Sequence, residues 1–561
     1  MGNESQVRAS ANRAMKVEWL AFAHLPGFPS IFVDFLADFE KVADFYGGGR
    51  LVLPLSEDES ERLGERASQV STRLAERAAL CRILHEQNVR WGRSDAALAA
   101  IQELSEPGTV AIVTGQQVGL FTGPLFTLYK AWTAMAVARR LRALGLRAVP
   151  VFWIHSEDHD LAEVTGCGVF GGESEWVEVR YPTSEDEEGR PASALILDER
   201  IEEARQGLLG ALPNSEFLPE IATLLEDAYR PGVSLAEAFA RTMAHLHAET
   251  ELILLDPSDE RLKRLMAPVF SRVIREWPRL SEALRTESER LRARGYPPQI
   301  HPERGQAFLF CLEDGRRRPL VWEDGRFVLR GGGKGFSVRE LLDEIAEAPG
   351  RFSPNVALRP LVQDALLPTF AYVGGPSEIA YFAQLGPMYA ALDLPPPLLC
   401  PRLSLTLVEP RVADLLARYD LTLTDLFAGI EAVERRLLER TLGDGHAFEE
   451  AQRAVTEALE KLRPLLREAE PTLERPLERA QAAMRRQIET LRQHYLQARA
   501  RREEVLSRHA RRLVLTLAPR GMLQERAMNA FYFLARYGAR LFRAIREEWE
   551  PDTRAHGVLF F

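Results

Sequence analysis

The chain has 561 residues, of which 46% are hydrophobic and 27% charged, and a formal net charge of −10. One hydrophobic core rarely exceeds about 250 to 300 residues, so this length predicts more than one domain. The acidic balance disfavours a general binder of nucleic acid or of anionic membranes. No apolar run reaches the roughly 18 residues that would indicate a membrane-spanning helix.

Four cysteines are scattered without CxxC spacing, which predicts neither a disulfide framework nor a zinc cluster. The N-terminus has no apolar signal core and becomes patterned only after about Met15. Together these features predict a cytoplasmic protein in a reducing compartment. The cysteines are Cys81, Cys167, Cys311 and Cys400.

Helical periodicity dominates residues 30–102, so we expect residues 1–105 to form an N-terminal helical layer that packs on the core. Residues 106–424 follow a different pattern, in which short continuous apolar runs alternate with Gly- or Pro-containing turns and helices. This recurrence predicts an α/β fold with a parallel sheet. The expected strands are residues 109–113, 148–154, 252–255 and 366–373.

Insertions are expected near residues 170–250 and 300–350. The second contains Asp314-Gly315 and Asp324-Gly325 between apolar runs, which predicts an antiparallel meander. Gly331–Gly335 lacks the Gly-Lys-Ser/Thr ending of a phosphate loop, and Ser337 with Glu340 is a better match to a helix capping box. His245 and His247 lie in an apolar helical stretch and are interpreted as packing or surface histidines.

Residues 425–512 are rich in Glu, Arg, Leu and Ala, with Pro471 and Pro476 marking a reversal. The pattern predicts a long antiparallel helical coiled coil, and residues 513–561 are expected to return to the core as helix. One pair of helices leaves an apolar seam that a partner copy or the core must cover. The alternative is a helix pair packed wholly within one chain. Residues spaced seven apart are Leu477, Met484, Leu491, Ala498 and Val505.

Thr114–Gln117 and the following Gly119–Thr122 bring amides, hydroxyls and glycine to the end of the first strand. A helix is expected to begin at Pro124, and a helix N-terminus favours anions, so the turn could bind phosphate or carboxylate. A purely structural turn is the competing interpretation. Gly374–Glu378 has the same architecture and the same two interpretations.

His155–Asp160 ends the second strand with ionisable groups whose side chains alternate between two sides. Substrate binding or proton transfer is one interpretation, and a polar helix-capping network is another. A metal site is a third, although the spacing does not match the HExxH or HxxEH patterns of zinc hydrolases. No metal site is therefore predicted.

Six short motifs follow one another in a fixed order over about residues 20–550. They are Thr114–Gln117, Gly119–Thr127, Trp153-Ile154 with Glu157–Asp160, Gly375–Glu378, Pro401–Ser404 and Leu523–Arg526. Jointly they make the chain resemble the BshC family, the cysteine-adding enzymes of bacillithiol biosynthesis. His155 departs from the family pattern, where a small residue is expected.

The resemblance implies a Rossmann-like core, akin to nucleotidyltransferases and class I aminoacyl-tRNA synthetases, with two connecting insertions. It further implies a coiled coil that supports a homodimer. The implied reaction is a ligation of the L-cysteine carboxylate to the amine of glucosaminyl malate, with ATP as the expected activator. No metal or organic prosthetic group is implied.

Mapped onto this sequence, the family motifs predict Glu157, Asp158 and His159 as the catalytic set, with Asp158 and His159 orienting the amine or removing its proton. Arg402 would neutralise negative charge. The alternatives are a metal-dependent hydrolase using His155, Glu157 and His159, and a non-catalytic coiled-coil scaffold. The predicted substrate-binding residues are Thr114, Gly115, Gln116, Gln117, Thr122, Gly123, Asp160, Gly375, Ser377, Glu378 and Arg402.

Overall fold

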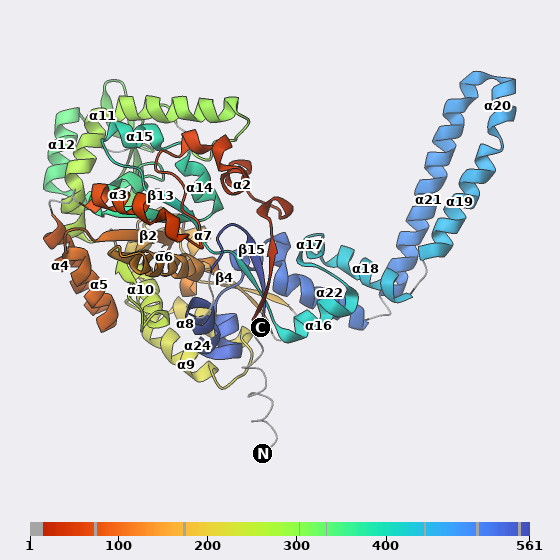
Figure 1. Cartoon of the computed structure of the whole chain (residues 1–561), viewed down its shortest axis with the longest axis horizontal. Helices are drawn as coiled ribbons and strands as arrows, with labels where there is room; N and C mark the ends of the chain where they lie inside the picture. Colours follow the sequence, from red (N-terminus) through yellow and green to blue (C-terminus); the bar gives the residue numbers. More distant parts are fainter. Residues whose placement is uncertain are drawn as a thin grey trace, which may run out of the picture.

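A computed structural model of the whole chain shows an α/β body from which a long helical hairpin projects (Figure 1). The structure describes residues 15–71, 76–171, 175–301, 303–332, 334–442, 445–500, 504–547 and 551–561. The first 14 residues of the predicted N-terminal layer lie outside this part. In the described part, no helix combines the length and apolarity needed to cross a membrane.

The body is organised around a five-stranded sheet in which all neighbouring strands are parallel. Its strands are β2 (Val110–Gln117), β3 (Ala148–His155), β6 (Ile253–Leu255), β12 (Thr369–Gly374) and β13 (Leu398–Pro401). The predicted parallel sheet is thus confirmed, and β13 adds a strand that the sequence did not reveal. One boundary was wrong, because Leu366 ends helix α13 (Arg359–Leu366) and the strand begins at Thr369.

The spatial order is β13-β12-β2-β3-β6. From β2 the chain builds outward through β3 to β6, then returns to the other side of β2 with β12 and β13. The connection that follows β2 therefore leads to one side of the sheet and the connection that follows β12 leads to the other, so the switch point lies between β2 and β12. In open parallel sheets such a switch point opens a ligand-binding crevice at the carboxyl ends of the strands.

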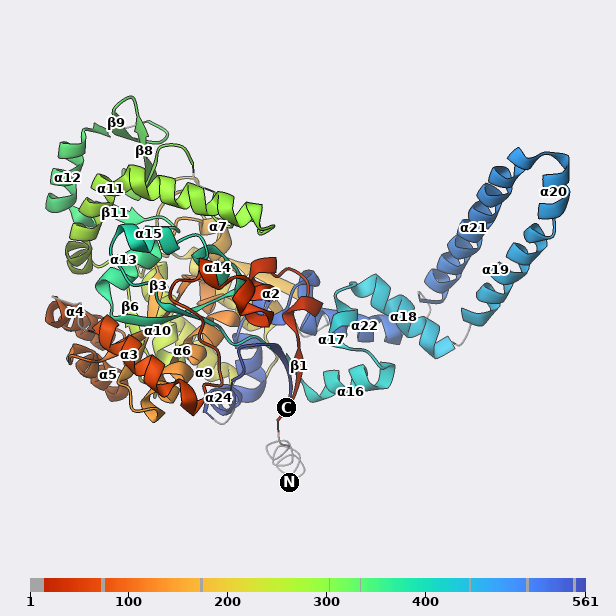
Figure 2. The same cartoon turned by 45° about the horizontal axis from the view of Figure 1, so that its top comes forward.

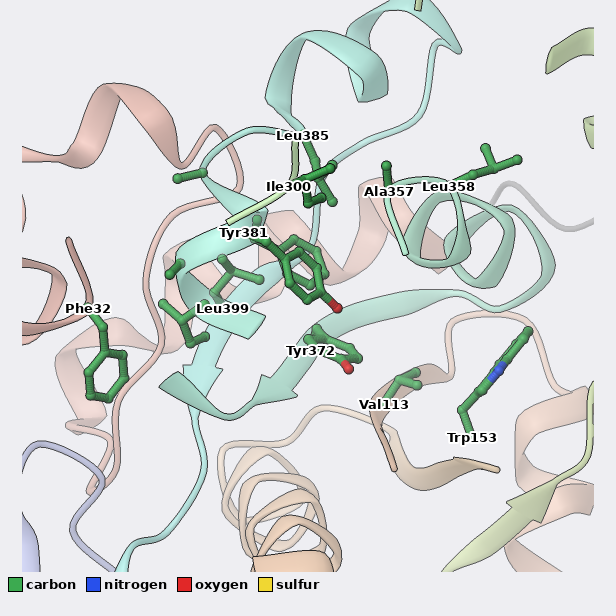
Figure 3. Packing of buried hydrophobic residues seen from close by; sticks show 14 of the residues in the cluster. Phe32, Val113, Trp153, Ile300, Ala357, Leu358, Tyr372, Tyr381, Leu385 and Leu399 are labelled. Atoms are coloured by element: carbon green, nitrogen blue, oxygen red, sulfur yellow. The ribbon is translucent and has the colours of Figure 1, made fainter. Parts of the chain in front are cut away.

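Alternate residues of β2 pack into opposite faces of the sheet, which explains the continuous apolar run. Ala111 and Val113 belong to one core cluster, whereas Val110 and Ile112 belong to another. Val113 lies in the first cluster with Trp153 of β3 and Tyr372 of β12 (Figure 3). A strand covered on both faces needs apolar side chains at every position.

Helix α6 connects β2 to β3 and spans Phe126–Ala143. It begins two residues later than predicted, because Pro124 forms an isolated bridge with Asn529 and Leu125 occupies the N-cap. Helices from the predicted N-terminal layer do pack on the core, among them α4 (Arg77–Arg90) and α5 (Asp95–Ser105).

Both predicted insertions contain their own small sheets. The first holds β4 (Gly166–Phe170) with β5 (Trp176–Arg180), followed by helices α8 (Arg200–Ala211), α9 (Leu218–Ala228) and α10 (Leu235–Leu246). Helix α11 (Glu260–Ala293) leads to the second.

The second insertion is the predicted antiparallel meander, formed by β7 (Gln306–Glu313), β8 (Arg316–Glu323), β9 (Arg326–Leu329), β10 (Gly335–Phe336) and β11 (Phe352–Pro354). Asp314-Gly315 and Asp324-Gly325 all have positive φ, as their hairpin turns require. The Ser337–Glu340 capping box is confirmed at the start of α12 (Val338–Glu347).

The two ends of the chain meet in a three-stranded sheet. β15 (His556–Phe560) lies between β1 (Lys16–Leu20) and β14 (Leu405–Val408). The prediction of purely helical terminal segments was therefore wrong at both ends. A five-residue strand at a terminus carries too little period-2 signal to be separated from its helical surroundings.

The hairpin consists of α19 (Gly445–Glu460) and α20 (Arg463–Ala469) antiparallel to α21 (Glu474–Ala500), and it projects from the body in both views (Figures 1 and 2). Helices α18 (Ile430–Leu442) and α22 (Glu504–Leu517) join it to the core. The reversal at Pro471 is as predicted. Of the residues spaced seven apart, Leu477 is buried, whereas Met484, Leu491 and Val505 are exposed.

Candidate active site

A cavity of about 610 Å³ lies at the carboxyl ends of β2, β3 and β12, the edge that contains the switch point. Its walls come from the sheet, helices α6 and α13, the second insertion and the C-terminal segment, together with residues 157–163 after β3, residues 299–301 and residues 375–381 after β12. From the predicted set it is lined by Gln116, Gln117, Glu157, Asp158, Gly375, Ser377, Glu378 and Arg402. The sequence-predicted strand ends thus converge on one site.

A buried ion pair joins Lys130 of α6 to Glu378 of α14 (Pro376–Phe382), directly across the switch point. The Lys130 ammonium also donates to Gly115 O at 2.8 Å and to Gln116 Oε1 at 2.9 Å. Glu378 accepts from Tyr372 Oη at 2.5 Å and from the Gly375 amide at 2.7 Å. These partners hold the pKa of Glu378 below its usual range against the effect of burial, whereas burial lowers the pKa of Lys130.

A second buried pair joins Glu157 to Lys263 of α11, whose ammonium also donates to Phe352 O at 2.8 Å. Asp158 accepts from Gln117 Nε2 at 2.8 Å, and the same amide donates to Glu163 Oε2 at 2.8 Å. Glu157, Asp158 and Glu163 therefore give one side of the cavity an acidic character.

His155 lines the cavity, but its Nε2 atom is buried and has no hydrogen-bond partner. Burial and the nearby cations Arg359 and Lys130 hold the pKa of His155 well below its usual range, so the ring is neutral. A Cβ on Gly115 would lie 2.7 Å from this Nε2, so only glycine leaves room for the ring. His155 is thus a neutral wall residue at the end of β3.

His159, a predicted catalytic residue, is not among the residues that line the cavity. Its Nδ1 accepts from Arg317 Nη1 at 3.1 Å, and its ring lies beside Phe310. Burial and Arg317 lower the pKa of His159. Arg317 itself does line the cavity, as do Phe310 and Asp158, whose Oδ1 lies 4.0 Å from His159 Nδ1, so His159 can act on the site through these neighbours.

Two other predicted residues, Thr114 and Asp160, make hydrogen bonds that stabilise the fold. Thr114 is buried and donates to Val373 O at 2.8 Å, which links β2 to β12. Asp160 caps helix α7 (Leu161–Val164) by accepting from the Glu163 amide. The structure thus places these two side chains within the strand and cap network, away from the cavity lining.

The Thr122-Gly123 turn also lies apart from the cavity, although both residues and Phe121 have the positive φ values of a special turn. Asn529 Nδ2 donates to Phe121 O and to Gly123 O, both at 2.8 Å. The turn is therefore bound by the C-terminal segment, which occupies the place the sequence suggested for an anion.

Four further cations line the cavity but were not among the predicted site residues: Lys130, Arg317, Arg359 and Arg526. Arg359 is buried and donates to the hydroxyls of Tyr372 at 3.2 Å and Tyr381 at 3.0 Å. The one available signal was an isolated lysine in the apolar run Leu128–Trp132 of a helix. Buried charges are rare unless paired, so such a lysine indicates a partner inside the fold.

The proposed metal ligands do not converge. Among the described residues, no group of three His, Cys, Asp or Glu side chains is arranged to hold a metal ion. Glu157 is bound to Lys263, and His159 to Arg317. The geometry thus gives no support to the alternative of a metal-dependent hydrolase.

The strand order and the charged cavity at the switch point define a Rossmann-like protein with a small-molecule site. Comparison with known families agrees, because residues 15–403 match the model described as "Bacillithiol biosynthesis BshC, N-terminal Rossmann-like domain" and residues 405–561 match that of the "C-terminal coiled-coil domain". The chain therefore belongs to the BshC family of bacillithiol biosynthesis.

Two relatives that match nearly the whole length of this chain are both named "Putative cysteine ligase BshC". The protein from Salinibacter ruber is 38% identical over 546 residues, covering 96% of this chain and 97% of the relative. That from Koribacter versatilis is 36% identical over 522 residues, covering 92% and 95%. The predicted family and the Rossmann-like and coiled-coil fold class are thereby confirmed.

Proposed function

We propose that this chain is an amide-forming ligase that joins the carboxylate of L-cysteine to the free amine of glucosaminyl malate. Its membership of the BshC family and the names of its relatives support the class of reaction. The observation that carries the substrate proposal is that both cations and carboxylates line one cavity at the switch point. Such a cavity can hold carboxylates and an amine at the same time.

The cations that line the cavity include Lys130, Arg359 and Arg402, which suit the carboxylates of the malate group. The carboxylates that line it include Glu157 and Asp158, which suit the amine. These charged groups would orient the amine toward an activated cysteine carboxyl carbon. Holding the two reacting groups in this way removes much of the entropic cost of a bimolecular reaction.

Asp158 is the proposed amine-binding carboxylate, because it lines the cavity and is held by Gln117. Glu157 would support it electrostatically from its pair with Lys263. His159 keeps a role as a positioning residue that acts through Arg317. A proton leaves the amine as the carbon–nitrogen bond forms, and Asp158 would accept it.

Amide formation from a carboxylate is uphill in water, so the proposal includes activation by ATP. The cysteine carboxylate would displace pyrophosphate to form an adenylate, or ADP to form an acyl phosphate. The amine then attacks the acyl carbon and releases AMP or phosphate, respectively. Cations in the wall of the cavity would stabilise the negative charge on either leaving group.

The test is direct synthesis with purified full-length protein, L-cysteine, glucosaminyl malate and ATP. We expect an amide product whose mass equals the sum of the two substrates less one water, and release of AMP or ADP identifies the activated intermediate. Asp158→Asn should abolish product, whereas His159→Ala should retain part of the activity. Failure to form product in the presence of ATP, or full activity of Asp158→Asn, would refute the proposal.

A homodimer through the hairpin is also proposed. Leu462, Leu465, Met484 and Leu491 are large apolar side chains that remain exposed on the projecting helices. Contiguous exposed apolar surface on a helical arm favours association with a partner. A second copy of the same hairpin would cover these residues.

A further inference from the structure

The motif Leu523–Arg526 has no role in the reaction described so far, yet it lies next to the cavity. Its helix, α23 (Gln524–Ala527), packs beside β14 in the C-terminal part of the chain. The remaining walls come from residues before position 403. Arg526 is thus the one contribution to the cavity lining from the segment that matches the coiled-coil family model.

Gln524 and Glu525 fix this segment with hydrogen bonds to the backbone of β14. Gln524 accepts from the Leu407 amide at 2.8 Å and donates to Leu407 O at 2.9 Å. Glu525 Oε2 accepts from the Leu405 amide at 2.9 Å. Both side chains are almost completely buried, which fixes the backbone from which the exposed Arg526 side chain extends.

Glu525 is fully committed to other partners. Its Oε1 accepts from Arg402 Nη2 at 2.7 Å and from Ser404 Oγ at 2.9 Å. Because Ser404 donates its only hydroxyl proton to this carboxylate, it accepts from His556 Nδ1, 2.8 Å away. Thr406 then donates to His556 Nε2 at 2.9 Å. This chain of bonds holds Arg402 in place, and each Glu525 oxygen accepts from a partner other than Arg526.

Arg526 therefore differs from the other cations at the cavity. Within the described residues the Arg526 side chain has no hydrogen bond or ion pair, whereas Lys130 and Arg402 are paired with carboxylates and Arg317 and Arg359 donate to neutral partners. Burial of part of the side chain and the neighbouring Arg402 lower the pKa of Arg526, and Glu525 opposes this shift. A guanidinium held open at a ligand cavity is a ready bidentate partner for an anion.

We propose that Arg526 is an anion-binding residue of the active site, supplied by the C-terminal domain to the Rossmann-like pocket. Its ligand is a carboxylate or phosphate oxygen pair of a bound substrate. This inference deepens the proposed ligase function and rests on it for the identity of the substrate. The two sources of the anion, the malate group and the nucleotide, are separated by experiment.

The experiment compares wild-type, Arg526→Gln and Arg526→Lys full-length proteins, with Arg540→Gln as an exposed control outside the cavity. Losing one charge-assisted contact should raise the KM of one substrate by about tenfold or more, with a smaller change in kcat. A rise for glucosaminyl malate assigns the carboxylate, and a rise for ATP assigns the phosphate. Arg526→Lys should recover part of the loss because lysine keeps the positive charge but lacks the paired N–H donors of the guanidinium.

Calorimetric titration with L-malate and with inorganic pyrophosphate makes the result independent of catalysis. We expect wild-type protein to bind one of these probes and Arg526→Gln to bind it at least tenfold more weakly. If wild-type protein forms no amide but this difference persists, the anion site stands and the ligase proposal falls. Equal probe affinity and equal KM values in wild type and Arg526→Gln would overturn the anion site.

Discussion

Substitutions at the Lys130–Glu378 pair can separate its contribution to the stability of the sheet from its contribution to activity. Both side chains are nearly buried, with 3% and 16% of their surfaces exposed. Removing one member of a buried pair leaves an uncompensated charge and typically costs about 3 to 5 kcal/mol. Lys130→Met should fall in this range, since it also removes the donors to Gly115 O and Gln116 Oε1.

The double variant Lys130→Met/Glu378→Gln should recover most of that loss. It contains no unpaired charge at these two positions, and the carbonyl oxygen of a glutamine at 378 can accept from the Gly375 amide while its NH2 group donates to the Tyr372 hydroxyl. Replacing a buried pair by neutral groups is often close to neutral for stability. We therefore expect a coupling energy of about 2 kcal/mol or more between the two positions. Activity should stay lost, because the cavity has lost a cation and an anion.

Hydrogen exchange of the β2 and β12 amides provides the assay, because it reports local stability in a chain with more than one domain. Lys461→Met, at an exposed position outside the cavity, serves as the control and should change stability by no more than about 0.5 kcal/mol. Additive losses in the single and double variants would refute the reasoning. So would a Lys130→Met protein with unchanged protection of both strands.

Three further predictions follow from other parts of the molecule. Gly115→Ala should disrupt the cavity wall and reduce activity at least tenfold, since its Cβ would lie 2.6 Å from a β3 carbonyl; Gly210→Ala, with no atom within 4 Å, should be fully active. Burial lowers the pKa of His247 to about 3 from 6.5, so the unfolded state binds the proton first and stability falls as the pH drops below about 6.5. Because His155 is also buried and neutral, the effect of His247 is measured as the difference in stability between wild type and His247→Gln in denaturant titrations; this difference should fall by about 2 kcal/mol between pH 7 and 5, and an unchanged difference would contradict the reasoning. Leu465→Arg should shift the proposed dimer toward monomer in sedimentation velocity, whereas the exposed Glu468→Arg on the same helix should not; equal masses for both would argue against the hairpin interface.

Local sequence predicted the central sheet well because strands covered on both faces must be continuously apolar. The same reasoning missed β13, since Leu398–Pro401 is only four residues long and follows three prolines. The predicted end of β2, at residue 113, was also too early, because the strand continues to Gln117. Thr114–Gln117 is polar and was taken as a turn, but it still pairs with Phe152–His155 of β3.

For the site, strand ends were a reliable guide and turn composition was not. Glu157 and Asp158 follow a buried strand, so topology alone brings them to the cavity. Arg317 arrives on a hairpin from a distant insertion, and no local pattern encodes that contact. The Thr122-Gly123 turn has the composition of an anion site, but its carbonyls are bound by Asn529, more than 400 residues along the chain.

These long-range contacts show why the two family regions form one functional unit. The models divide the chain near residue 404, but Arg402 on one side is neutralised by Glu525 on the other at 2.7 Å, with 4% and 0% of their side chains exposed. An arginine at that depth without its carboxylate would be an uncompensated buried charge. The C-terminal segment is thus needed to set the charge of the Rossmann pocket, and Arg526 extends the same dependence to the substrate. Helices α22 and α23 therefore connect the projecting hairpin to the cavity, with Gln524 Nε2 of α23 donating to Thr516 O of α22 at 2.8 Å.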